Sequence, residues 1–196
     1  MENFKDYRKY KWFFALSGNL VLGGKNAAQN DELINRVKES GKEYLIMHTS
    51  EPGSPFSVIL SDVKKLSKKD IAEASIFTGC FSRAWRQGKE KTRVEIFKSS
   101  QLYKSKNMKT GTWGVAGETD EVEIKLELVL TRQDGILRAI PEKSVKDKKQ
   151  ILLKISPGNI EKKDMPAKLD LELSNSFSQE EILSALPTGG FRIIRK

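Results

Sequence analysis

Hydrophobic and polar positions follow two different rhythms along the chain, and the change of rhythm predicts its secondary structure. Two short apolar runs, "WFFAL" and "LVLGG", flank the turn residues Ser17, Gly18 and Asn19 and predict a β-hairpin. The next stretch, "NAAQNDELINRVKES", repeats apolar residues at helical spacing and stops at Gly41, which predicts a helix. "EYLIMHT" and "FSVIL" then indicate two strands on either side of a loop at residues 50–55 that contains Pro and Gly.

A second and longer helix is predicted between Ser67, a residue type that caps helices, and Gly88, a typical helix stop. Its apolar positions recur three and four residues apart, at Ile71, Ala74, Phe77 and Phe81. The alternating stretch "TRVEIF" and the short stretch "GTWGVAG" follow it as predicted strands.

The second half of the chain is richer in predicted strands. "EVEIKLELVL" alternates charged and apolar side chains and predicts one strand with a single solvated face. "GILRAI", "QILLKI" and the closing "GGFRIIRK" add further strands, with a short capped helix at "SQEEILSALP". We therefore predict a single α+β domain over residues 1–196, in which two main helices pack on a mixed or antiparallel sheet. Residues 1–117 carry its core motifs, and residues 118–196 form a strand-rich extension that continues the first sheet or packs on it.

Positive charge is concentrated in one quarter of the chain. The formal net charge is +9, and residues 63–110 alone supply +9, with thirteen Lys and Arg against four Asp and Glu. A surface that binds a polyanion explains such an asymmetry, although a general bias towards lysine also produces basic surfaces.

The sequence contains no pattern typical of an enzyme or a metal site. His48 is the only histidine and Cys80 the only cysteine, which argues against a multi-histidine or zinc site and is typical of a reducing cytoplasm. There is no G-x-S-x-G motif, and Gly-Gly-Lys lacks the flanking residues of an NTPase phosphate loop. No apolar stretch reaches the roughly 18 residues of a membrane span. We expect a folded, cytoplasmic protein that is not an enzyme, with no catalytic residues, metal, cofactor or membrane partner.

The stretch "LVLGGKNAAQN" has two interpretations. In the first, Gly23 and Gly24 only permit a tight connection from strand to helix, and Asn26 caps the helix. In the second, Lys25, Asn26 and Gln29 also face a phosphate at the helix N-terminus. The residues by themselves leave both interpretations open.

Four stretches occur in the order of a known domain. They are "WFFALSGNLVLGGKNAAQNDELI", "EYLIMHTSEPGSPFSVIL", "ASIFTGCFSRAWRQGKEKTRVEIFKSSQLYKSKNMKTGTWGVAG" and "LLKISPGNIEKKDMPAKL". Together they resemble NFACT-R, the RNA-binding domain of ribosome quality-control proteins of the Tae2/NEMF type, also called fibronectin-binding-protein-like. The resemblance is most specific over the first 117 residues, and the C-terminal half is most similar to archaeal members.

The resemblance implies an RNA-binding module that acts on rRNA or tRNA, with the large ribosomal subunit as a wider partner, in translation quality control. It also implies a standalone form, because the tRNA-recruiting domain and coiled-coil arms of the longer relatives are absent from this sequence. Two positions depart from the family pattern: Lys25 stands where Arg is frequent, and Pro55 stands where His is common. DNA as a ligand stays open, and so does an adaptor that binds protein and has an incidental basic face.

The predicted RNA-binding surface consists mainly of basic residues. We expect it to include, besides the turn residues, Lys68, Lys69, Arg83, Arg86, Lys89, Lys91, Arg93, Lys104, Lys106 and Lys109. We expect Pro157 and Gly158 to form a turn that brings Lys162 and Lys163 to the same face. Trp85 is either a stacking platform for a base or a core residue.

Overall fold

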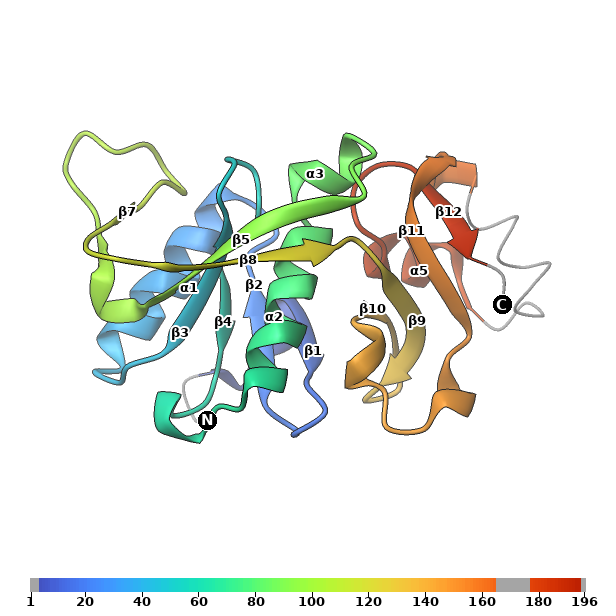
Figure 1. Cartoon of the computed structure of the whole chain (residues 1–196), viewed down its shortest axis with the longest axis horizontal. Helices are drawn as coiled ribbons and strands as arrows, with labels where there is room; N and C mark the ends of the chain where they lie inside the picture. The colour runs from blue at the N-terminus through green and yellow to red at the C-terminus, as the bar shows by residue number, and fades with distance from the viewer. Residues whose placement is uncertain (1–3, 165–176, 195–196) are drawn as a thin grey trace.

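The N-terminal hairpin forms one end of a six-stranded sheet (Figure 1). In the computed structural model, which describes residues 4–164 and 177–194, the strands lie in the order β1-β2-β4-β3-β5-β8 and every pairing is antiparallel. Their bounds are β1 Lys11–Phe14, β2 Leu20–Gly23, β3 Leu45–Thr49, β4 Ser57–Ile59, β5 Lys91–Lys98 and β8 Asp120–Lys125.

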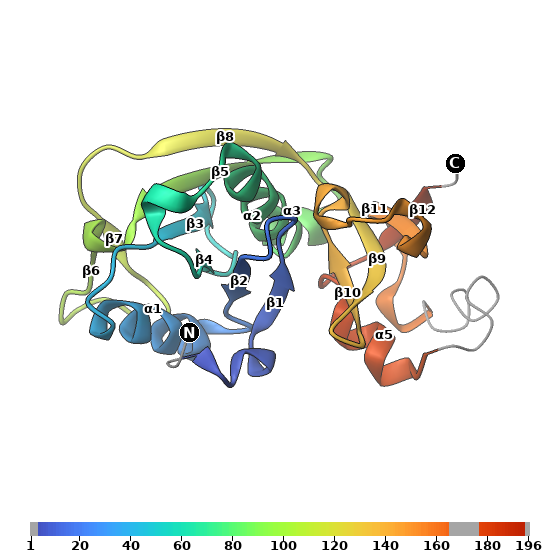
Figure 2. The same ribbon diagram turned by 90° about the horizontal axis from the view of Figure 1, so that it is seen from below.

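Two main helices cover opposite faces of this sheet (Figure 2): α1 (Ala27–Glu39) and α2 (Lys68–Cys80). Successive side chains of a strand point to opposite faces, and the two halves of the core follow this alternation. Trp12 packs in the same apolar cluster as the α1 residues, whereas its neighbour Phe13 packs in the cluster that contains the α2 residues. Because both faces are covered, all four residues of β2 are buried, as the unbroken apolar run "LVLG" requires.

The prediction of one continuous helix over residues 67–88 is wrong, because the structure has two helices there. The first, α2, ends at Cys80, and a separate short helix, α3, spans Arg83–Arg86. Ser82 causes the break: it has an extended backbone, and its hydroxyl accepts a hydrogen bond from the backbone N–H of Ala84. The N–H of Arg83 donates to the carbonyl of Gly53 at 2.8 Å, so α3 is held by the loop at residues 50–55.

The single strand predicted at "EVEIKLELVL" is also wrong, because the stretch forms two strands in two sheets. β8 pairs with β5 in the large sheet, whereas β9 (Leu128–Gln133) belongs to a second, four-stranded sheet. The chain leaves the first sheet at Leu126, whose N–H donates to the carbonyl of Glu90. The alternation of side chains continues through the switch, so the pattern gives no signal of it.

The second sheet has the order β10-β9-β11-β12, with the short helix α5 (Gln179–Ala185) beside it (Figures 1 and 2). Its other strands are β10 Ile136–Ile140, β11 Leu153–Ile160 and β12 Phe191–Ile194. Only β8 of the C-terminal half extends the first sheet. The second sheet packs on the first, since one core cluster contains Phe13 and Phe77 together with Leu128 and Phe191. The predicted α+β domain is confirmed.

Short elements complete the fold. β6 (Leu102–Tyr103) and β7 (Gly114–Val115) form a two-stranded ribbon. Isolated 3-10 turns are η2 Tyr7–Lys9, η3 Val63–Lys65, η4 Ser99–Gln101, η5 Glu142–Ser144, η6 Lys148–Gln150 and η7 Lys162–Asp164.

The turn predicted at Pro157 and Gly158 is wrong, because both residues lie inside β11. The register of β11 against β12 shifts between Pro157 and Ile160, which marks a β-bulge, one of the places where a strand tolerates proline. A Cβ on Gly158 would lie 2.6 Å from the backbone nitrogen of Arg192, so this position must be glycine for the two strands to approach.

Candidate nucleic-acid interface

A groove of about 650 Å³ opens beside the N-terminal end of α1. The groove is lined by His48 of β3 and by Glu95 and Phe97 of β5. These residues lie on the same face of the sheet as the residues that pack against α1. The other walls come from the turn before α1, the loop at residues 50–55, the start of α3, and residues 111–115. Segments far apart in the sequence therefore meet in one depression.

Three of the predicted site residues, Lys25, Arg83 and Arg86, lie together in this groove. All three are exposed, and none has an ion-pair partner in the part of the chain that the structure describes. A further cation, Lys11, lines the groove with its ammonium 4.4 Å from the centre of the Phe81 ring. The uncompensated positive charge of Lys25, Arg83 and Arg86 suits a phosphate group.

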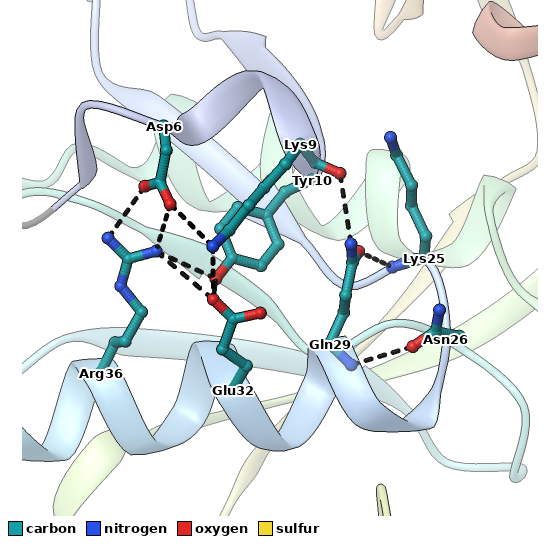
Figure 3. Close-up of polar contacts among 8 residues, drawn as sticks. All are labelled: Asp6, Lys9, Tyr10, Lys25, Asn26, Gln29, Glu32 and Arg36. Carbon is teal, nitrogen blue, oxygen red and sulfur yellow. Dashed lines mark hydrogen bonds and ion pairs between the residues drawn. The ribbon is translucent and has the colours of Figure 1, made fainter.

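The structure explains most of the turn before α1 without a ligand (Figure 3). The side chain of Asn26 caps the helix by accepting from the N–H of Gln29 at 2.9 Å, and the Gln29 side chain accepts from the N–H of Lys25 at 3.0 Å. A Cβ on Gly24 would lie 2.1 Å from Oδ1 of Asn30, so this glycine is required by close packing and not by a positive φ. Lys25 is the exception: its side chain points away from these contacts.

A buried arginine adds to the positive potential near this turn. Arg138 of β10 is 8% exposed, donates from Nε to the carbonyl of Trp12 at 3.0 Å, and lies over the Trp12 ring. No carboxylate among the described residues pairs with it, and burial lowers its pKa to about 10. Partial burial of Lys25 and, secondly, the charge of Arg138 lower the pKa of the Lys25 ammonium. An anion at Lys25 would relieve this repulsion.

A network of charged residues holds the N-terminal segment against α1 (Figure 3). Asp6 pairs with Arg36 at 2.9 Å and with Lys9 at 2.7 Å, and Glu32 accepts from the hydroxyl of Tyr10 at 2.9 Å. The hydrogen bonds from Arg36 and Lys9 hold the pKa of Asp6 well below its usual range. These contacts fix α1, and with it the turn that carries Lys25.

The groove lining also combines aromatic rings with a carboxylate, a combination that was not predicted from the sequence. Phe56, Phe97 and Trp113 line the groove, and the centre of the His48 ring lies 4.6 Å from that of the Phe56 ring. Glu95 faces the same space, and its carboxylate has no hydrogen-bond or ion-pair partner among the described residues. The alternation of "TRVEIF" could have placed Glu95 and Phe97 on one face, but no local signal joins them to Trp113.

Asp31 of α1 holds Trp113 in place. It accepts from Nε1 of Trp113 at 2.8 Å and from Nζ of Lys104 at 2.9 Å. Burial raises the pKa of Asp31, but hydrogen bonds from the Gly111 backbone, Lys104 and Trp113 outweigh it and hold the pKa below its usual value. A Cβ on Gly111, where φ is +78°, would lie 2.6 Å from Cβ of Ala27, so the loop can dock on α1 only with glycine there.

Four other predicted site residues are neutralised by acidic neighbours. Lys89 pairs with Glu51, Lys91 with Glu123, Arg93 with Glu121 and Lys104 with Asp31. The carboxylates that pair with β5 come mainly from β8, so the charge asymmetry of residues 63–110 is partly cancelled in space.

The remaining predicted lysines lie elsewhere. Lys68 and Lys69 begin α2, so the length of this helix, roughly 18 Å, separates them from α3. Lys106 and Lys109 are exposed in the loop between β6 and β7. Lys163 pairs with Glu161, and the side chain of Lys162 and residues 165–176 lie outside the described part of the chain.

Trp85 is a core residue and not a stacking platform. It is 1% exposed, and its Nε1 donates to the carbonyl of Gly190 at 3.0 Å. Within the described residues there is no group of three or more His, Cys, Asp or Glu that could hold a metal ion. The same residues contain no helix long and apolar enough to cross a membrane.

Comparison with known proteins decides the family. A family model described as the NFACT protein RNA binding domain matches residues 9–117, more than half of the chain. The chain belongs to this family. The similarity to NFACT-R inferred from the sequence motifs is thereby confirmed, and the family role is RNA binding in ribosome quality control.

Two relatives extend the comparison. The archaeal Rqc2 homolog aRqcH of Methanocaldococcus jannaschii is 29% identical over 204 residues, which cover 98% of this chain and 30% of that protein. The chain therefore spans under a third of the length of this relative. The solved C-terminal part of the fibronectin/fibrinogen-binding protein of Streptococcus suis shares the fold, with a TM-score of 0.52 at 24% identity over 59% of this chain and 44% of that one.

The groove lies within the NFACT RNA-binding domain itself. Residues 9–117 contain all of its lining residues except Thr188. Arg138 and the second sheet lie outside the matched stretch and support the domain from one side.

Proposed function

We propose that this chain binds RNA through the groove, with backbone phosphates at Lys25, Arg83 and Arg86. One observation carries the proposal: three cations without ion-pair partners among the described residues, from separate segments, converge on one depression of an RNA-binding family domain. The ion-paired residues Lys89, Lys91 and Arg93 contribute little, because their charge is already compensated.

The relatives favour a ribosomal context for this activity. aRqcH is described as an Rqc2 homolog, so we infer that rRNA of the large subunit, or tRNA bound to it, is the physiological ligand. Reactions of the longer relatives are not part of this proposal, because the chain matches 30% of aRqcH.

The proposal is tested by RNA affinity as a function of salt concentration. Replacing Lys25, Arg83 and Arg86 by alanine should weaken binding and reduce the salt slope by roughly two to three units, because each lost phosphate contact removes one counterion-release event. The matched control replaces Lys89, Lys91 and Arg93 by alanine, which removes the same formal charge from ion-paired positions. The control should keep nearly the wild-type slope. Equal slopes for the two folded triple variants, or an affinity independent of salt, would contradict the proposal and favour a protein-binding adaptor.

A further inference from the structure

The groove has two chemically different kinds of lining residue. Lys25, Arg83 and Arg86 supply uncompensated positive charge, whereas Glu95 supplies a carboxylate beside the rings of His48 and Trp113. A phosphate would be repelled by Glu95, so the part of a nucleic acid that contacts Glu95 is not its backbone.

Building on the proposed function, we infer that the groove holds one unpaired nucleotide of a single RNA strand. Its phosphate lies against Lys25, Arg83 and Arg86, and its base lies against Glu95, His48 and Trp113. This assignment gives each group of lining residues the part of a nucleotide that suits its chemistry.

Glu95 is placed to accept hydrogen bonds from the edge of a base. It lies opposite Glu121 of β8, which pairs with Arg93, but no described residue pairs with Glu95 itself. It is half-buried on β5, and the buried Phe97, two residues further along, lies on the same face. An ionised carboxylate is an acceptor only, so its partner must present N–H groups.

His48 presents a second acceptor beside it. The two residues are directly paired across β3 and β5. Nδ1 of His48 lies 2.7 Å from the carbonyl of Thr49, so Nδ1 carries the hydrogen and Nε2 of the neutral ring is an acceptor. Burial lowers the pKa of His48, which favours this neutral form.

Two neighbouring acceptors select among the bases. Guanine presents two adjacent donors, N1–H and the N2 amino group, on its Watson–Crick edge, whereas uracil presents only one N–H there. Phe56, Phe97 and Trp113 supply the apolar and aromatic surface for the ring. In a duplex these edge donors are already paired, so the site accepts an unpaired guanosine and excludes a base-paired one.

The test compares a short uridine oligonucleotide, the same oligonucleotide with one central guanosine, and a duplex of equal length. The guanosine-containing strand should bind roughly tenfold more tightly than the uridine strand. Glu95→Gln should abolish this preference without weakening uridine binding, because it removes the negative charge and replaces one of the two acceptor oxygens by an NH2 donor. Glu39→Gln, which removes one exposed charge from the far end of α1, should leave the preference intact.

Tryptophan fluorescence reports the position of the base. Trp12 and Trp85 are each 1% exposed, whereas Trp113 is half-buried and lines the groove. The guanosine strand should quench the emission of the wild-type protein, and Trp113→Phe should remove the quenching.

The outcomes separate this inference from the proposed function. Four outcomes would overturn the nucleotide site alone. Two concern base preference: salt-dependent binding of the uridine strand with no preference for guanosine, and a preference that is unchanged in Glu95→Gln. The other two are quenching that persists in Trp113→Phe and equal affinity for the duplex. Failure of every RNA to bind would overturn both.

Discussion

At the scale of single residues, different residues of the turn before α1 have different roles: some stabilise the fold, and one is placed to bind a ligand. Asn26 and Gln29 are engaged in capping, and Gly24 is confined by Asn30, whose Oδ1 accepts from the N–H of Phe56 at 3.2 Å. Lys25 alone has a side chain directed away from these contacts (Figure 3). The phosphate interpretation of this turn therefore rests on Lys25 and not on the glycines.

Neighbouring substitutions should separate these two roles. Gly24→Ala should lower the free energy of unfolding by about 1–3 kcal/mol, because its Cβ would force Asn30 away from Phe56. Lys25→Ala should leave stability unchanged and reduce the salt slope of RNA binding by about one unit. Urea denaturation and RNA titration of both variants measure this. A Lys25→Ala protein with wild-type affinity and slope would show that the turn has only a structural role.

At the scale of elements, the sequence predicts which segments are helical or extended better than it predicts where they break. The spacing of apolar residues over 67–81 identifies the helix correctly. The break at Ser82 depends on the carbonyl of Gly53, which is distant in sequence and accepts from the N–H of Arg83. The switch of sheets at Leu126 is hidden for a similar reason: a tertiary contact with Glu90 determines it.

The break itself positions the arginines. Ser82→Ala should cost about 1 kcal/mol of stability by removing the cap of α3, and it should also weaken RNA binding because Arg83 and Arg86 lose their orientation. Ser67→Ala is the control: it removes the cap of α2 at the opposite end of that helix, with a similar stability loss. Thermal melts and RNA titrations of both variants check this. An equal change in RNA affinity for the two variants would show that α3 orientation is irrelevant to binding.

At the scale of the whole molecule, composition predicted a basic surface but not its shape. The excess charge of residues 63–110 is real, yet Lys89, Lys91 and Arg93 are compensated by Glu51 and by carboxylates of β8. The groove forms where chain segments from residues 9–117 meet, with Thr188 added from the second half. The pattern of charges along the sequence did not indicate that Glu95 and Trp113 belong to this site. The family motifs located the domain correctly, because they mark the turns and loops that build the groove.

The central claim is that RNA occupies the groove, and ultraviolet crosslinking in cells tests it most directly. Trypsin digestion followed by mass spectrometry would identify the crosslinked peptides, and sequencing would identify the RNA. The account predicts crosslinks in the peptides 43–64, 70–83 and 110–125, which carry the groove aromatics Phe56, Phe81 and Trp113. Crosslinks confined to residues 126–164, in the second sheet and its loops, would contradict it.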